Sequence, residues 1–349
     1  MEGRTIDTDQ EKCHMKHEIL RWGVLSTAKI GMEHVTPAMI EGERCEVVAI
    51  ASRNRGTAEK AAEELGIERA YGSYEALLED PDIQAVYIPL PNHLHLEWIG
   101  KAVRAGKHVL CEKPLVLRSS EIAELKQLSR ESGKLIGEGF MVLHQPRWQR
   151  VRELVQNGSL GRFVHAQSVF SFFLDDPGNI RNKPEYGGGG IFDIGCYPTV
   201  LSRYVLNEEP QRVLASVELD PDFGVDRLAS VILQFPSGPV TFTVSTQMVD
   251  FQYFQFFGTE KMVELQTPFN TPDFRSMTIK VNSGNILEAP KVAETFSPVN
   301  QYTRQGDAFA RAVFEGAKFA GSLDNAAKNL KVLEAIFRAA ESGRWEEVK

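Results

Sequence analysis

The chain alternates short apolar segments with helical patterns between about residues 20 and 140, and this alternation constrains its fold more than any other feature. Five of the apolar segments read as strands: 20–26, 45–52, 85–90, 108–113 and 134–140. Helical stretches between them end at Gly66, Gly106 and Gly133, as helix C-caps often do. Strands that alternate with helices at this spacing predict a parallel, doubly wound sheet.

After about Gln145 the pattern changes to longer strand-like runs joined by short turns. The runs are 162–174, 212–219, 227–235, 239–249, 251–259 and 276–282. They indicate an open, mainly antiparallel sheet, and helical stretches near the C-terminus complete an α+β domain. We therefore expect the fold class α/β, with a loose extension at 1–19, a Rossmann doubly wound domain at 20–144 and a second, α+β domain at 145–349.

Composition narrows the class of partner. The chain has 349 residues and a formal net charge of −8, which disfavours nucleic acid or an anionic membrane as the main partner. No window is apolar enough to span a membrane, and the N-terminus lacks the apolar core of a secretory signal. Four cysteines are scattered without metal-ligand spacing. We expect free thiols, no metal site and a cytoplasmic location.

The first strand-to-helix turn predicts a site for a pyrophosphate. A dinucleotide fold has G-x-G-x-x-G there, so that backbone N–H groups at a helix N-terminus can approach the phosphates. In this chain only the last glycine is present, and serine and alanine, the next smallest residues, occupy the other two places. The expected cofactor-binding residues of this turn are Ser26, Thr27, Ala28, Lys29, Ile30 and Gly31.

The ends of the next strands add further candidate cofactor contacts. Where an acidic residue would hold the ribose of NAD, the chain has Ser52, Arg53 and Asn54, which suit the 2′-phosphate of NADP. The alternative is an arginine of a solvated loop, so NAD stays possible. After the third predicted strand come Pro89, Asn92 and His95, which could line the nicotinamide ribose, although Asn92 could be only a helix N-cap.

Glu112, Lys113 and Pro114 end the fourth predicted strand. In an open parallel sheet that edge faces the ligand crevice, so Glu112 and Lys113 are expected to contact the cofactor, with Lys113 partly desolvated beside it. Desolvation and a nicotinamide cation would both lower the pKa of this lysine, which would let it exchange a proton with a substrate hydroxyl. The alternative is a lysine on an exposed turn, paired with Glu112.

The second half of the chain supplies a complementary set of groups. Gly187–Gly190 precede a helical pattern on which Asp193 and Tyr197 lie four residues apart and share a face. The alternative for this pair is a local hydrogen bond between them. Arg181 could reach a substrate hydroxyl or form a salt bridge, and Phe140 is expected at the substrate pocket. Three further residues near Phe140 could roof the same pocket: His144, Arg147 and Trp148, although for Trp148 packing in the core or against a helix is the favoured alternative.

Taken in order, the motifs VLSTAKIG, SRN, PNHLH, CEKP and GGGGIFDIGCY resemble those of the Gfo/Idh/MocA oxidoreductases. The likeness covers nearly the whole chain from about Leu20. It implies hydride transfer between a nicotinamide and a sugar, diol or polyol carbon, with Lys113 as acid or base and hydroxyl anchor. It also implies that Asp193 and Tyr197 belong to the site, and that the second sheet forms the contacts of a homodimer or homotetramer.

Within that family, Tyr197 resembles glucose–fructose oxidoreductase and the dihydrodiol dehydrogenases, whereas inositol dehydrogenases have histidine at this position. Ser26 and Ala28, in place of glycines, resemble the dihydrodiol and NADP-xylose dehydrogenase branch. The resemblance therefore favours aldose or diol chemistry with catalytic Lys113, Asp193 and Tyr197. Two other functions remain open on the same fold: a non-catalytic dinucleotide sensor, and an NAD-dependent glycosidase.

Overall fold

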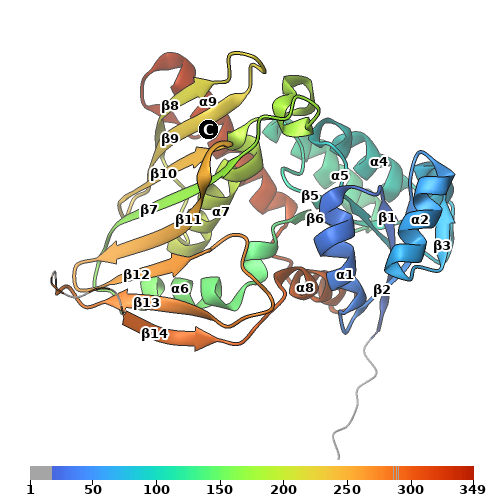
Figure 1. Ribbon diagram of the computed structural model, residues 1–349, viewed down its shortest axis with the longest axis horizontal. Helices are drawn as coiled ribbons and strands as arrows, with labels where there is room; N and C mark the ends of the chain where they lie inside the picture. Colours follow the sequence, from blue (N-terminus) through green and yellow to red (C-terminus); the bar gives the residue numbers. More distant parts are fainter. Residues whose placement is uncertain (1–17, 286, 288, 290) are drawn as a thin grey trace, which may run out of the picture.

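The computed structural model describes residues 18–349 except 286, 288 and 290, so nearly all of the extension expected at 1–19 lies outside the described residues. Two sheets with their helices lie side by side, and the chain passes from one to the other after residue 140 (Figure 1). The expected combination of a parallel doubly wound sheet and a second, mainly antiparallel sheet is confirmed.

The first sheet has six parallel strands in the order β3-β2-β1-β4-β5-β6. Its strands are β1 (Leu20–Leu25), β2 (Cys45–Ala51), β3 (Arg69–Tyr71), β4 (Ala85–Ile88), β5 (His108–Glu112) and β6 (Ile136–Gly139). The sequence analysis missed β3, because three residues are too few to show an apolar alternation. The strand order reverses between β1 and β4. In open parallel sheets, ligands bind at the point where the strand order reverses.

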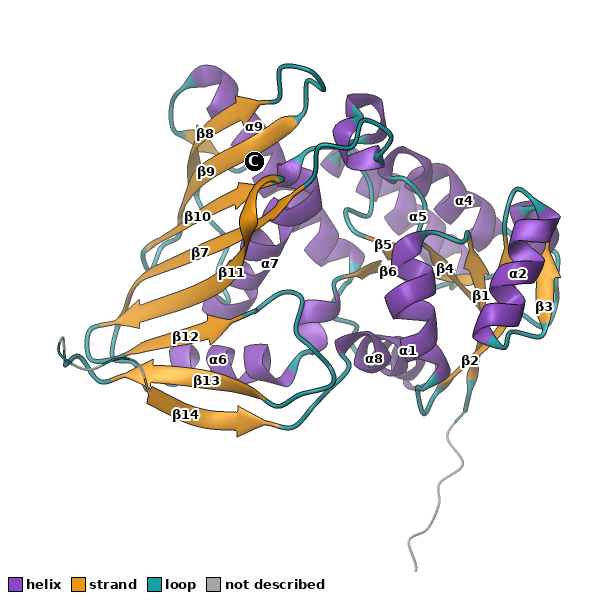
Figure 2. Cartoon of the chain, viewed as in Figure 1, coloured by secondary structure: helices purple, strands orange, loops and turns teal. Residues whose placement is uncertain are grey.

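Helices cover both faces of the first sheet (Figure 2). They are α1 (Thr36–Ile40), α2 (Arg55–Leu65), α3 (Tyr74–Leu78), α4 (His95–Arg104) and α5 (Ile122–Ser132). On one face Trp22 and Val24 of β1 pack in a cluster with Val35 and Met39. Gly66 and Gly133 take left-handed C-cap conformations as predicted, and Gly106 follows the C-cap of α4.

The second sheet has nine strands in the order β14-β13-β12-β11-β7-β10-β9-β8-β15. They are β7 (Phe163–Phe173), β8 (Arg212–Leu219), β9 (Asp226–Gln234), β10 (Pro239–Ser245), β11 (Gln247–Gly258), β12 (Met262–Gln266), β13 (Met277–Asn282), β14 (Lys291–Phe296) and β15 (Glu346–Glu347). Only β7 and β10 pair in parallel; the remaining pairs are antiparallel. The sequence analysis missed the short strands β12, β14 and β15 at the two ends of this order.

Four more helices complete the structure: α6 (Pro146–Gln156), α7 (Cys196–Leu206), α8 (Gln301–Glu315) and α9 (Leu323–Ser342). Helices α6, α7 and α9 lie against one face of the second sheet, and the other face is bare (Figure 2). Helix α8 returns to the first sheet, where Phe309 packs 5.1 Å from the Trp22 ring and Thr303 Oγ1 donates to the Ala38 carbonyl. The domain boundary at residue 144 stays a prediction. Helix α8 belongs to the second predicted domain but packs against the first sheet.

Short 3₁₀ turns occupy several connections: η2 (Asn92–Leu94), η3 (Ser119–Glu121), η4 (Met141–His144), η5 (Ile180–Asn182) and η6 (Pro184–Tyr186). Two π-helical turns, η1 (Gly31–Val35) and η7 (Ile191–Gly195), open the helices that continue as α1 and α7. π-Turns often mark functional sites. None of the helices in the described part of the chain combines the length and apolar character needed to cross a bilayer.

Candidate functional site

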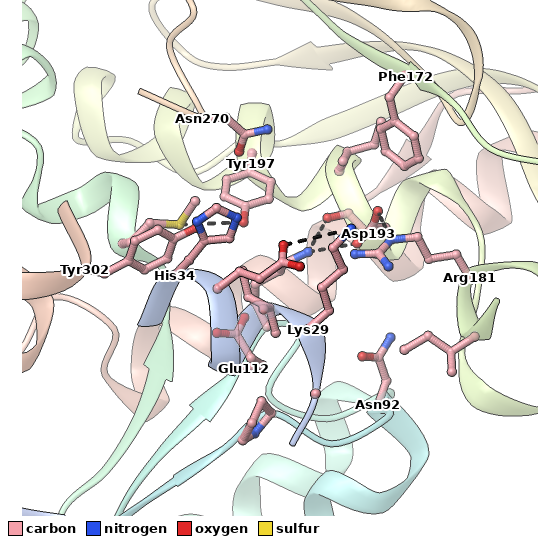
Figure 3. A pocket seen from close by; sticks show the side chains of 18 of the residues that line it. Lys29, His34, Asn92, Glu112, Phe172, Arg181, Asp193, Tyr197, Asn270 and Tyr302 are labelled. Carbon is pink, nitrogen blue, oxygen red and sulfur yellow. Dashed lines mark hydrogen bonds and ion pairs between the residues drawn. The ribbon is translucent and has the colours of Figure 1, made fainter. Parts of the chain in front are cut away.

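A cavity of about 1000 Å³ lies between the two sheets. Its wall is formed on one side by η1 and the ends of β4 and β5, and on the other side by η7 and β7. Figure 3 shows side chains from both halves pointing into this space. Ten of the predicted site residues line it: Ala28, Lys29, Ile30, Pro89, Asn92, Glu112, Lys113, Arg181, Asp193 and Tyr197.

The turn after β1 is built around Ser26, which adopts φ 130°, a conformation that favours glycine. Its Oγ donates to the Pro89 carbonyl at 3.1 Å and accepts from the Ala28 N–H at 3.2 Å. We expected Ser26 to contact the cofactor, but its hydroxyl proton is already donated to the Pro89 carbonyl. The Met32 N–H is the donor to the Ala28 carbonyl, so the N–H groups of Lys29, Ile30 and Gly31 precede the helical ladder.

Ser52, Arg53 and Asn54 follow β2, beside that turn but outside the lining of the cavity. The Asn54 side chain caps α2 by accepting from the Thr57 N–H at 3.0 Å. Arg53 is exposed at the N-terminus of the same helix. This placement offers a cation and a helix N-terminus to an anion at the end of β2.

Asn92 lines the cavity as expected, whereas His95 does not. The Asn92 amide donates to the Gly187 carbonyl at 2.9 Å, which ties the first half of the chain to the glycine run of the second. His95 is fully buried and does not line the cavity; its ring nitrogens lie 2.9 Å from the Pro114 carbonyl and 2.8 Å from the Leu90 carbonyl. It therefore holds the loop after Lys113 instead of reaching a ligand directly.

Lys113 directly follows β5 and reaches across the cavity to the second half of the chain. Its ammonium donates to Asp193 Oδ1 at 3.0 Å and to the Asp193 carbonyl at 2.5 Å. Burial is the largest single influence and favours the neutral amine, but the Asp193 carboxylate, joined by smaller contributions from Cys196 and Glu112, holds the pKa of Lys113 above its ordinary value. The lowered pKa that we expected is wrong for the ligand-free protein, because the sequence did not show the carboxylate at hydrogen-bonding distance.

Asp193 lies in the π-turn η7, between two cations. Arg181 Nε donates to Asp193 Oδ2 at 2.7 Å, while Lys113 binds the other oxygen. Burial alone would raise the pKa of Asp193, but Arg181 and Lys113 together hold it well below its ordinary value. Of the two alternatives for Arg181, the salt bridge is the one observed, and the carboxylate of Asp193 faces these cations rather than Tyr197.

Glu112 precedes Lys113 and accepts from the Tyr87 hydroxyl at 2.6 Å. Burial raises the pKa of the Glu112 carboxyl. The alternative of an exposed turn predicted an ion pair between Glu112 and Lys113. The ammonium of Lys113 instead binds Asp193. Glu112 therefore forms the floor of the cavity together with the end of β4.

Tyr197 follows one turn after Asp193, and its ring lies below the Lys113 ammonium, 5.0 Å from Nζ to the ring centroid. Among the described residues, the Met141 sulfur, at 3.6 Å, is the one hydrogen-bond partner of the Tyr197 hydroxyl. Phe140 packs edge-on against Tyr197 with ring centroids 5.6 Å apart, and is itself 1% exposed, so it supports the tyrosine without lining the cavity. The substrate contact expected for Phe140 is corrected accordingly.

The other three residues proposed as a roof do not line the cavity. Arg147 and Trp148 are buried: Arg147 donates to the Gln266 and Thr267 carbonyls, and Trp148 Nε1 donates to the Pro268 carbonyl, so both hold the loop after β12. His144 is half-buried and stacks on Phe319, which follows α8.

The glycine run that precedes η7 has a steric cause. Gly189 has φ +101°, and a Cβ there would run into the carboxylate of Asp226. Asp226 Oδ2 in turn accepts from the Ile191 N–H at 2.5 Å, which fixes the first turn of the helix that carries Asp193. Sequence reasoning missed Asp226, because a single acid at the start of a strand carries no motif.

Sequence reasoning also missed part of the cavity wall. Figure 3 shows His34, Phe172, Asn270 and Tyr302 around the same space. They come from η1, β7, the loop after β12 and α8, which meet only in the folded chain. The described residues contain no group of three His, Cys, Asp or Glu placed to hold a metal ion.

Comparisons with known proteins agree with this geometry. Residues 20–140 match the GFO_IDH_MocA family model, described as an oxidoreductase family with an NAD-binding Rossmann fold, and residues 148–264 match the GFO/IDH/MocA C-terminal domain. An uncharacterized oxidoreductase of Rhizobium meliloti, ORF334, is 42% identical over 95% of this chain and 100% of its own length. A D-xylose 1-dehydrogenase (NADP(+)) of Haloferax volcanii is 38% identical over 93% of this chain and 98% of its own.

Among solved structures, KijD10, a 3-ketoreductase from Actinomadura kijaniata in complex with NADP and TDP-benzene, has a TM-score of 0.85 at 29% identity. The match covers 92% of this chain and 98% of that one. The resemblance inferred from the motifs is thus confirmed, and the chain belongs to the Gfo/Idh/MocA family of oxidoreductases.

Proposed function

We propose that this oxidoreductase is an NADP-dependent dehydrogenase that transfers a hydride between the nicotinamide and a carbon of an aldose or related diol. One observation carries the proposal: Lys113 and Tyr197 face one cavity, side by side, and that cavity also reaches the turn after β1. The similar xylose dehydrogenase and the NADP complex of the similar ketoreductase support the substrate class and the coenzyme.

The residues present fit this coenzyme. The N–H groups of Lys29, Ile30 and Gly31 precede the helical ladder and would hold the pyrophosphate, and Arg53 with Ser52 would hold the 2′-phosphate. A Cβ at position 31 would lie only 3.3 Å from the Pro89 ring. Glycine at this position therefore lets the turn pack closely against Pro89, beneath the place of a ligand. When bound, the coenzyme supplies the hydride acceptor or donor.

Lys113 and Tyr197 would bind the reacting hydroxyl. Two of the three ammonium hydrogens of Lys113 are used on Asp193, which leaves one for a substrate oxygen. The Tyr197 hydroxyl has a sulfur as its recorded partner, and a substrate oxygen would be a much stronger one. Both groups are protonated at neutral pH without coenzyme, because Asp193 raises the pKa of Lys113, and burial raises that of Tyr197 well above its ordinary value.

This protonation state suits reduction of a carbonyl, in which one of the two groups gives up its proton. Oxidation of a hydroxyl needs the reverse transfer, which a nearby cationic ring would ease by lowering the pKa of Lys113. Asp193 would not exchange the proton itself, because its carboxylate is held ionised by two cations. Its part is to fix the lysine, and that of Arg181 is to fix Asp193 from the other side.

A screen of aldoses, cyclitols and diols with NADPH, NADP, NADH and NAD tests the proposal. Turnover of an aldose or diol with preference for the phosphorylated coenzyme is the expected result. Coenzyme binding without turnover of any of these compounds would instead favour the sensor. Release of a glycoside leaving group with no net change in nicotinamide absorbance would favour the glycosidase.

Homodimer or homotetramer formation through the second sheet also belongs to the proposal. The bare face of that sheet supports it, as do the exposed side chains Phe173 and Phe251, 62% and 53% exposed, on neighbouring strands. Light scattering after size exclusion would report the assembly. A cytoplasmic location is proposed on the strength of three buried free thiols, Cys45, Cys111 and Cys196.

A further inference from the structure

The cavity extends beyond the residues that serve the proposed reaction. A second arm runs along η1 and α1 and is closed on its other side by the loop after β12 and the start of α8. Its wall includes Glu33, His34, Glu41, Asn270, Phe274 and Tyr302. The pyrophosphate turn, residues 26–31, lies directly before η1, and the arm runs away from that turn along η1 and α1 as far as Glu41.

The wall of the arm combines aromatic surface with polar groups. The His34 and Tyr302 rings stack with centroids 6.2 Å apart and an interplanar angle of 18°, and Phe274 is 81% exposed. Gln301 lines the cavity and is 3% exposed; its amide nitrogen donates to the Phe269 carbonyl, and its Oε1 has no partner among the described residues. Flat apolar faces beside a few amide groups are typical of sites for small polar organic ligands.

The charge of the wall narrows the ligand class. Among the lining residues, the cations are Lys29, Lys113 and Arg181, and the acids are Glu33, Glu41, Glu112, Asp176, Asp193 and Asp273. Each of the three cations already lies beside an acid: Lys29 at 3.9 Å from Glu33, and the other two on Asp193. Lys29 belongs to the pyrophosphate turn, and the wall of the arm carries three acids: Glu33, Glu41 and Asp273. Arg275 follows Phe274 in the chain but does not line the cavity.

We propose that this arm binds an uncharged group attached to the reacting sugar, such as the second ring of a disaccharide, and selects against phosphate esters. The inference rests on the proposed function and names its substrate class more closely. A phosphate placed there would lose water, find no unpaired cation and lie beside Glu33, Glu41 and Asp273. This property separates the chain from the similar ketoreductase, which was solved with TDP-benzene.

The test uses matched substrates built on the best aldose of the screen. For each hydroxyl, kcat/KM is measured for the free aldose, for the disaccharide extended at that hydroxyl and for the phosphate ester at the same position. For at least one hydroxyl, we expect the disaccharide to be used as well as the free aldose and the ester at least about tenfold less well, since like charges at close range are strongly disfavoured. An ester used as well as the disaccharide at every position would overturn the inference, as would rejection of every disaccharide.

Variants connect the effect to the arm. Glu33→Gln combined with Asp273→Asn should raise the ratio of kcat/KM for the ester to that for the free aldose, and Phe274→Ala should lower the ratio for the disaccharide. Glu46→Gln removes an exposed glutamate of β2 outside the cavity and is the matched control, expected to change neither ratio. Ratios that follow the control would contradict the inference while aldose turnover persists, whereas absence of any aldose or diol turnover would refute the proposed function itself.

Discussion

The Lys113 ammonium lies 3.0 Å from the carboxylate of Asp193, a residue 80 positions later in the chain. This contact joins the end of β5 to the π-turn η7, and with it the part of the chain that carries the first sheet to the part that carries the second. Because the carboxylate determines how tightly the lysine keeps its proton, the contact makes a prediction about pH.

Asp193→Asn should move the pH dependence of hydroxyl oxidation to lower pH. Asp193 holds the pKa of Lys113 above its ordinary value, and without that charge burial and Arg181 both favour the neutral amine. Arg181→Gln removes a charge that lowers the pKa of Lys113, so it should move the same profile to higher pH. Profiles of kcat/KM between pH 6 and about 10 would report both shifts. Two variants with shifts of the same sign, or none, would contradict this coupling.

Gly189→Ala should damage the site severely. A methyl group there would run into Asp226, and the residue would also keep a left-handed backbone at φ +101°. Gly224→Ala is the control, since Gly224 has φ +70° and its Cβ would meet nothing closer than 3.9 Å. The control should lose about 1–2 kcal/mol of unfolding free energy, and Gly189→Ala more than that together with most of its activity. If the two variants lost the same unfolding free energy in chemical denaturation and the same fraction of kcat, the clash with Asp226 would have no energetic cost, contrary to this prediction.

Arg53→Ala should weaken binding of NADPH by at least about tenfold and leave binding of NADH nearly unchanged, because only the former carries the 2′-phosphate. Arg55→Ala is a suitable control, since Arg55 pairs with Glu59 on the surface of α2. Fluorescence titration of the four combinations gives the answer. If both coenzymes lose affinity alike, or neither does, Arg53 does not read the phosphate.

Much of this site follows from the sequence, because position along a strand predicts position in a parallel sheet. Lys113, at the end of an apolar strand, and the run before Asp193 could be placed at one crevice in this way. Neighbours distant in the chain could not be foreseen. Asp226 carries no motif, and the sign of the pKa shift of Lys113 depends on a carboxylate 3.0 Å away that only the folded chain supplies.

The same limit explains the remaining errors. His95 was expected at the ligand from its place after β4, but burial of its ring depends on the Pro114 carbonyl, which belongs to another strand end. Strands such as β3, with three residues, are defined by their neighbours rather than by their own pattern. The arm of the cavity is formed by η1 and a loop roughly 240 residues later, and no local pattern in the sequence shows that the two segments meet.

Glu138→Gln should make the protein more stable above neutral pH. Glu138 is 1% exposed on β6, its Oε1 accepts from the Leu115 N–H at 2.8 Å, and burial raises its pKa from 4.5 to about 7. A carboxyl with a raised pKa in the folded state stabilises the fold below pH 4.5, and that contribution is lost as the pH rises towards 7. The loss is on the order of 3 kcal/mol at most.

The glutamine keeps the acceptor for Leu115 and removes the titration. The unfolding free energy should therefore change more between pH 5 and pH 8 in the wild type than in the variant. The reverse order would mean that Glu138 is stabilised as the ion, by Arg203 or another neighbour.

The central claim is that Lys113 handles the proton of the reacting hydroxyl, and Lys113→Ala tests it most directly. The measurement is kcat/KM for the best aldose or diol, alongside the Kd of NADPH for the same variant. We expect kcat/KM to fall by roughly 10²–10⁴ while coenzyme affinity stays within a few-fold, because a positioned acid–base group contributes about that much. Turnover within a few-fold of wild type on every accepted substrate would contradict the account.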